Sequence, residues 1–150
     1  GFRTPASEET SKIVFDEDNN GRSQNDLYMD GGAIFNFALA NVHKNINGLV
    51  EDMGWVKEDV GMYALHQANV FMVNYVRKML KADKALVPMN VKDYGNTGPA
   101  TIPFLFSDVC SSEHPYNLEK VIMSGFGVGL SWGSIAANLS ETHFYSPINK

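Results

Sequence analysis

The sequence has little cysteine and no long apolar run, and each absence excludes a class of protein. Cys110 is the only cysteine among 150 residues, so the chain cannot close an internal disulfide or build a cysteine-based zinc site. No apolar run approaches the roughly 20 residues of a membrane helix, and the N-terminus lacks the basic and apolar regions of a signal peptide. We therefore expect a cytoplasmic protein that does not associate with membranes.

Positive charge is scarce as well. Lysine and arginine total 12 against 17 acidic residues, which gives a formal net charge of −5. A nucleic-acid surface normally shows as clustered cations, and the nearest cluster here is formed by Arg77, Lys78, Lys81 and Lys84. Four cations at this spacing are more typical of a solvated helix face, so we expect no nucleic-acid partner. Hydrophobic residues make up 44% of the chain, which is ordinary for a globular domain.

The chain divides into a polar N-terminal segment and one domain. Residues 1–27 are rich in Ser, Asp, Glu and Asn and are predicted to be a linker or an N-terminal extension, with one short strand at Ile13–Phe15. Residues 28–150 have the length of a single domain. Because the sequence starts at Gly1 and not at methionine, we expect the chain to come from a longer protein.

Apolar periodicity predicts two helices and a strand in the first half of the domain. Asp30 is a suitable cap for a helix that ends near Gly54. Met62–Leu65 is a candidate buried strand, which delivers His66 at its C-terminal end. A second helix is predicted from Asn69, and its apolar side contains Met72, Val73, Val76, Met79 and Leu80.

The second half of the domain is predicted to continue this alternation. Val87–Val91 is expected to be extended, and Gly95–Gly98 to be a tight loop before a helix with Pro99 in its first turn. Two strands at Lys120–Met123 and Ser131–Leu139 are expected to be joined by the glycine-rich turn Gly125–Gly129. The alternation of strands and helices predicts a layered α/β fold.

His66 and Asn96 are the candidate catalytic residues. A neutral imidazole and a primary amide that point at one place form a pair of hydrogen-bond donors for a carbonyl oxygen that gains negative charge. Glycines on both sides of Asn96 allow the backbone to turn sharply, so that its amide can project into a cavity. Each residue also has a simpler interpretation, because His66 can be satisfied by local carbonyl groups and Asn96 can be a plain turn residue.

The remaining candidates have simpler interpretations too. The backbone N–H groups of the turn Gly125–Gly129 can form an oxyanion hole, but the local sequence favours a hairpin that needs positive φ. Cys110 is more typical of a buried small hydrophobe than of a nucleophile, although a hydrolase that uses it with His66 or His114 is conceivable. His43 and His143 have no partners at ligand spacing, so we expect no metal site.

Read in order, four motifs carry a family resemblance: His66-Gln67-Ala68-Asn69, Tyr94-Gly95-Asn96-Thr97, Gly125-Phe126-Gly127-Val128-Gly129 and Trp132-Gly133-Ser134. Together with the 30-residue separation of His66 and Asn96, this set resembles the C-terminal half of the beta-ketoacyl-acyl carrier protein synthase III family, within the thiolase-like superfamily. The resemblance covers roughly residues 28–139. It implies a thiolase-like half-fold, a mixed sheet layered with helices, which in the family packs as one half of a five-layered unit and forms homodimers.

The resemblance also implies a site and a reaction. A cysteine takes an acyl group from acyl-CoA, and His66 and Asn96 hold the thioester oxygen of malonyl-acyl carrier protein while it decarboxylates, with no cofactor. The backbone N–H of Val128 corresponds to part of the acyl oxyanion hole. Asn69 and Gly31 correspond to the pantetheine tunnel. Carrier-protein docking is assigned to the two cations of the second predicted helix, Arg77 and Lys78.

Two departures from the family pattern modify this expectation. The nucleophilic cysteine of the family belongs to the N-terminal half, and nothing in this chain matches it, so we expect half an enzyme that needs a missing N-terminal half and is inactive alone. Phe71 stands where the family often has a docking arginine. Phe71 and Val128 therefore leave open a thiolase-like acyltransferase of polyketide or surface-polysaccharide biosynthesis. A non-catalytic interaction module with the same half-fold is a further alternative.

Overall fold

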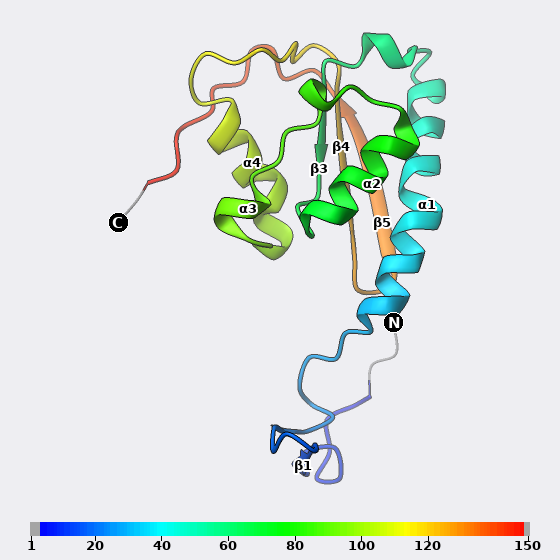
Figure 1. The fold of residues 1–150 in the computed structure, drawn as a ribbon, viewed down its shortest axis with the longest axis vertical. Coiled ribbons are helices and arrows are strands. Elements are labelled where there is room, and N and C mark those ends of the chain that lie inside the picture. Colours follow the sequence, from blue (N-terminus) through cyan, green and yellow to red (C-terminus); the bar gives the residue numbers. More distant parts are fainter. Residues whose placement is uncertain (1–3, 149–150) are drawn as a thin grey trace.

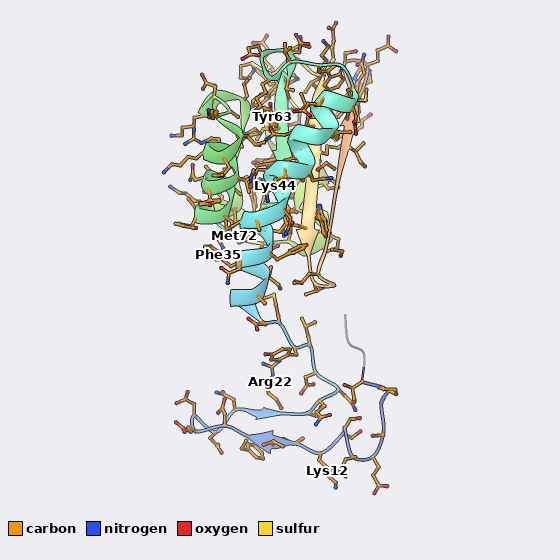
Figure 2. All side chains as sticks on the ribbon, turned by 90° about the vertical axis from the view of Figure 1, so that its right-hand side faces the viewer. Lys12, Arg22, Phe35, Lys44, Tyr63 and Met72 are labelled. Carbon is orange, nitrogen blue, oxygen red and sulfur yellow. The ribbon has the colours of Figure 1, made fainter. Side chains whose placement is uncertain are left out.

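The computed structural model describes residues 4–148, which form a small N-terminal hairpin and a layered α/β body (Figure 1). Strands β1 (Val14–Phe15) and β2 (Gly21–Arg22) pair antiparallel in the hairpin. Figure 2 shows this segment, with Lys12 and Arg22, extending away from the body. The short strand predicted around Phe15 is therefore confirmed, and the hairpin takes no part in the main sheet.

Helix α1 (Gly31–Asp52) begins where the sequence predicts. The Asp30 carboxylate accepts a hydrogen bond from the backbone N–H of Ala33 at 2.8 Å, which satisfies one of the unpaired donors of the first turn. The buried residues of α1 recur every four positions and form one stripe: Ala38, Val42, Ile46 and Val50. This stripe faces the sheet, and α1 runs along the whole length of the body (Figure 1). No helix in residues 4–148 is both long enough and apolar enough to span a membrane.

The main sheet has three strands in the order β3 (Met62–Leu65), β4 (Val121–Gly127) and β5 (Ser131–Ala137). β3 pairs parallel with β4, and β4 pairs antiparallel with β5, so the sheet is mixed as expected. Both C-terminal strands are confirmed. The glycine turn is shorter than predicted, because residues 125–127 continue β4 and pair with residues 131–133 of β5.

The alternation of side chains along β3 divides the core into two clusters. Tyr63 and Leu65 face α1 and α2 (Val70–Leu80), whereas Met62 and Ala64 face the opposite side of the sheet. Figure 2 shows Tyr63 of β3 behind α1, with Phe35 of α1 and Met72 of α2 at the same end of the helix layer. The opposite side is covered by α4 (Thr101–Val109), whose buried residues are Thr101, Leu105 and Phe106.

The connections contain short helices, among them the 3₁₀ turns η1 (Lys57–Asp59) and η2 (Lys84–Leu86). The prediction that Val87–Val91 is extended throughout was wrong at its end, because Val91 begins α3 (Val91–Tyr94). The side-chain oxygen of the buried Gln67 accepts a hydrogen bond from the Asn90 backbone N–H at 3.2 Å. A side chain thus satisfies this backbone donor, as a neighbouring strand would in a sheet. Gly95–Gly98 forms the expected loop, and the 3₁₀ turn η3 (Gly98–Ala100) carries Pro99 before α4.

One residue of α2 was assigned to the wrong side of the helix. Met79 was predicted to lie on the apolar side, but its side chain is 40% exposed. The buried residues of α2 are Met72, Val73, Val76 and Leu80, and they already complete a narrow stripe against α1 and the sheet. Met79 lies at the margin of that stripe.

Gly61 directly precedes β3 and is closely packed, so we expect its replacement to lower the stability of the fold. A Cβ atom on Gly61 would lie 1.9 Å from the Asn117 carbonyl oxygen, while its N–H donates to the Lys120 carbonyl at 2.9 Å. We expect Gly61→Ala to lower the free energy of unfolding by about 1 to 3 kcal/mol, because backbone must move to admit the methyl group. Chemical denaturation followed by circular dichroism measures the effect.

Gly48 provides the matched control. It lies inside α1, where an added Cβ meets nothing within 4 Å. Gly48→Ala should therefore raise the free energy of unfolding by about 0.5 to 1 kcal/mol through helix propensity. A Gly61→Ala variant as stable as the parent would contradict the close packing described here.

Candidate active site at the end of β3

His66 directly follows the last residue of β3 and is half-buried. Its backbone N–H continues the pairing with β4 by donating to the Ser124 carbonyl at 2.9 Å. The Nδ1 atom lies 2.6 Å from the Thr101 hydroxyl, and the ring meets Phe126 edge to face at 5.1 Å between centroids. Burial lowers the pKa of His66 below its usual value of 6.5, so the imidazole is neutral near pH 7. Among the described residues, no hydrogen bond engages its Nε2 atom.

Asn96 lies in the loop between α3 and η3. Its side-chain oxygen accepts from the Gly98 N–H at 2.9 Å, and the φ angles of Gly95 and Gly98 are 70° and 63°. Both glycines are needed, because a residue with a side chain rarely adopts these angles. The Asn96 side chain is exposed, and within residues 4–148 its amide NH₂ group makes no hydrogen bond. It is thus free to donate to a ligand.

One hydrogen bond links His66 to the segment that follows Asn96. Thr101, the partner of His66 Nδ1, is the first residue of α4 and follows Asn96 by five positions. The contact therefore ties the C-terminal end of β3 to the segment that carries the Asn96 loop. Thr101 was not singled out in the sequence, because a threonine in a helical pattern carries no sign of a partner 35 positions away.

The neighbours of His66 hold the backbone on both sides of it. Gln67 is fully buried, and its amide NH₂ donates to the Leu65 carbonyl at 2.7 Å. The Asn69 side-chain oxygen caps α2 by accepting from the Met72 N–H at 2.8 Å. The Gln67 amide thus has a structural role. The pantetheine contact expected of Asn69 stays a prediction, although its side chain is exposed and its NH₂ group remains available.

Two further candidates lie at the same end of the body. Val128, whose side chain is 56% exposed, lies in the turn between β4 and β5. β4 extends past the end of β3, so this turn lies beyond the strand end that carries His66. Gly31 is the first residue of α1, where an added Cβ would meet open space. Figure 1 shows the start of α1 and the β4–β5 turn together, and Phe37 contacts Trp132 across them at 5.0 Å between ring centroids. The roles expected of Val128 and Gly31 stay predictions.

The cations proposed for docking differ in their availability. The Arg77 guanidinium donates to the Ala82 carbonyl, just beyond the C-terminal end of α2, at 3.3 Å, whereas Lys78 is exposed. Phe71, on the first turn of α2, is 61% exposed and contacts Phe35 at 5.6 Å between ring centroids. An apolar surface therefore stands where the family pattern often has an arginine.

Cys110 is buried at the C-terminal end of α4, as predicted. Burial raises the pKa of its thiol to about 11, so almost none of it is thiolate near pH 7. The geometry gives no support to a hydrolase that uses Cys110. Within residues 4–148 there is no group of three or more metal-ligating side chains.

The environment of His66 predicts how stability depends on pH. Because burial depresses its pKa, the unfolded chain binds a proton more readily than the folded chain. The stabilisation contributed by neutral His66 is complete above pH 6.5 and is lost as the pH falls from 6.5 through the folded pKa. The parent should therefore lose more stability between about pH 7.5 and 5 than His66→Gln does, as measured by urea denaturation.

His143→Gln, at an exposed position, is the control and should follow the parent. Identical pH profiles for the parent and His66→Gln would contradict the depressed pKa.

Comparison with known proteins identifies the family of the chain. The family described as 3-Oxoacyl-[acyl-carrier-protein (ACP)] synthase III C terminal matches residues 50–139, more than half of the chain. The chain is 37% identical over 122 residues to the beta-ketoacyl-[acyl-carrier-protein] synthase III of Streptococcus sanguinis, covering 79% of this chain and 37% of that protein.

Solved structures agree with the fold. A crystal structure of a 3-oxoacyl-(acyl-carrier-protein) synthase III has a TM-score of 0.79 at 31% identity, covering 91% of this chain and 41% of that one. A 3-oxoacyl-(acyl-carrier protein) synthase from Burkholderia xenovorans has a TM-score of 0.66 at 38% identity, covering 77% and 33%.

The chain thus spans well under half the length of these relatives. The expected thiolase-like half-fold, with a mixed sheet and helices, is confirmed. The ordered motifs, the fold and the family match lead to one conclusion. The chain belongs to the 3-oxoacyl-[acyl-carrier-protein] synthase III family and corresponds to the C-terminal part of its members.

Proposed function

We propose that the chain is the C-terminal catalytic domain of a synthase III-like acyltransferase, which condenses acyl-CoA with malonyl-acyl carrier protein in fatty acid biosynthesis. The observation that carries this proposal is the neutral, half-buried imidazole of His66 with Nε2 unengaged, joined through Thr101 to the segment that holds Asn96. Neutral donors suit an oxygen whose negative charge appears only during the reaction.

The proposed reaction needs these donors at one step. Decarboxylation breaks the bond between the carboxylate carbon and C2 of the malonyl group, and the electron pair moves onto the thioester as an enolate. His66 Nε2–H and the Asn96 amide donate to the enolate oxygen. C2 then attacks the acyl thioester on a cysteine, forms the new carbon–carbon bond and releases the cysteine thiolate. No cofactor takes part.

We propose that the cysteine belongs to an N-terminal half that packs against this chain. The chain spans 37% of its Streptococcus relative, and its buried thiol has too high a pKa for the nucleophilic role. Large apolar side chains are exposed on and beside β5: Val128, Leu130, Trp132 and Ile135. Trp132 and Ile135 lie on opposite sides of β5, which pairs only with β4 among the described strands, and exposed apolar side chains of this kind are typical of an interface. The complete enzyme is proposed to form a homodimer, and the isolated chain is proposed to be inactive in condensation.

The donor roles can be tested on the polypeptide that includes the N-terminal half. His66→Ala and Asn96→Asp should each reduce decarboxylation of malonyl-acyl carrier protein by about 10²- to 10³-fold, because each removes one donor to the enolate oxygen. Aspartate keeps the oxygen that accepts from Gly98 N–H, so that the loop is preserved while the donor is lost. Release of ¹⁴CO₂ from labelled malonyl-acyl carrier protein measures this step.

Acylation of the cysteine by acyl-CoA is the internal control and should remain largely intact in both variants. Equal loss of both half-reactions would overturn the assigned roles. The chain alone should release no CO₂ above background. A folded complete protein that is inactive in both half-reactions would favour a non-catalytic interaction module instead.

Docking of the acidic carrier protein is proposed to use Lys78. Lys78→Glu should raise KM for malonyl-acyl carrier protein by about three- to tenfold, with a smaller effect at high salt and little change in kcat, because an exposed charge at an interface acts mainly on encounter. Malonyl-CoA, which has no protein surface, should be affected much less.

The matched control is Lys92→Glu, an exposed lysine on α3. It makes the same change of charge on another element and should leave KM for the carrier protein nearly unchanged. Equal effects of the two variants would indicate a general charge effect and would remove Lys78 from the docking surface.

A further inference from the structure

We infer that Thr101 is a positioning residue, which donates its hydroxyl hydrogen to His66 Nδ1 and thereby holds the imidazole in the tautomer that carries hydrogen on Nε2. The tautomer stands independently of the proposed function, whereas its catalytic consequence rests on that function. The distance between Thr101 Oγ1 and His66 Nδ1 is 2.6 Å, and the side chains come from α4 and from the end of β3.

The direction of this hydrogen bond follows from the partners of the hydroxyl group. Thr101 is 2% exposed, so its hydroxyl hydrogen has little access to water. Among the described residues, His66 Nδ1 is the only partner of Thr101 Oγ1. If the hydroxyl donates, its hydrogen and the Nδ1 lone pair are both satisfied.

The opposite direction leaves a buried donor without a partner. With hydrogen on Nδ1, the imidazole would donate to Thr101 Oγ1, and the buried hydroxyl hydrogen would then have no acceptor among the described residues. A buried donor without a partner costs more free energy than a typical hydrogen bond contributes. The tautomer with hydrogen on Nε2 is therefore the more stable one.

The other groups around His66 do not compete for this role. The Ser124 carbonyl of β4 is already the acceptor for the His66 backbone N–H, and Phe126 presents an apolar ring. The pKa of His66 is lowered by burial alone, with no contribution from a charged neighbour. A carboxylate or a backbone carbonyl accepts from Nδ1–H and would fix the opposite tautomer, whereas this buried hydroxyl donates to Nδ1 and leaves the hydrogen on Nε2.

The same contact orients the donor. Thr101 engages the ring at Nδ1, the nitrogen nearer the backbone, so that Nε2–H stays free to donate, and η3 connects the Asn96 loop to Thr101. One hydroxyl group therefore sets both the hydrogen position and the ring orientation of His66. In the proposed reaction Nε2–H is therefore already in place as a donor before the enolate forms, and no proton has to move between the ring nitrogens first.

The tautomer can be measured on the chain itself by ¹⁵N NMR at about pH 8, where a histidine of depressed pKa is neutral. Long-range ¹H–¹⁵N correlation spectra of the imidazole rings, assigned with His66→Gln, should show Nδ1 of His66 in the unprotonated range and Nε2 in the protonated range. Thr101→Ser keeps the hydroxyl and should give the same spectrum. Thr101→Val has the same shape without the hydroxyl and should move Nδ1 toward the protonated range as the second tautomer becomes populated.

Two outcomes would overturn the inference: hydrogen on Nδ1 in the parent, or an unchanged tautomer in Thr101→Val. The parent spectrum decides the first even if the valine variant fails to fold. In the polypeptide that includes the N-terminal half, Thr101→Val should lower kcat for decarboxylation at least tenfold with little change in KM, and Thr101→Ser should restore it. Intact decarboxylation with a shifted tautomer would count against the proposed enolate role of His66 and would leave the tautomer assignment standing.

Discussion

The parallel pairing of β3 with β4 is the constraint on which the candidate site depends. β3 has only four residues, and all of them are buried, with Tyr63 and Leu65 on one side of the sheet and Met62 and Ala64 on the other. A slip of one residue would exchange these two sets and would turn His66 away from its partners. Because parallel strands end at the same edge, this pairing also brings the β4–β5 turn to the side of the body where His66 emerges.

Polar residues beyond that edge are held by side-chain hydrogen bonds to the backbone. Gln67 bridges Leu65 and the Asn90 backbone, Asn69 caps α2, and Asn96 caps its own loop. Each amide uses its oxygen or its NH₂ for structure, and the exposed Asn69 and Asn96 keep their NH₂ groups. A residue in a turn can therefore have a structural role and remain a donor, so the two interpretations of Asn96 are compatible.

Local chemistry made part of this structure predictable. The cap at Asp30, the buried strand before His66 and the helix start at Asn69 depend on residues within four positions of each other, and all three were predicted, whereas the capping role of Asn69 was not. The helical start at Val91 and the role of Thr101 depend on partners 23 and 35 positions away in the chain, Gln67 and His66. Periodicity contains no information about such contacts. The ordered motifs indicated the family, whereas the hydroxyl that holds the histidine became visible only in three dimensions.

The neutrality of the two donors has a physical consequence for the proposed chemistry. A cation beside the substrate would attract the malonyl carboxylate as strongly as the enolate, and it would stabilise the ground state along with the transition state. A histidine kept neutral by burial and a primary amide provide fixed dipoles instead, which interact weakly with the leaving carboxylate and strongly with the oxygen that gains charge. The edge-to-face contact with Phe126 adds an apolar ring beside the imidazole. Apolar surroundings disfavour an ionised carboxylate more than neutral CO₂, so in the proposed reaction the burial that keeps His66 neutral would also favour decarboxylation.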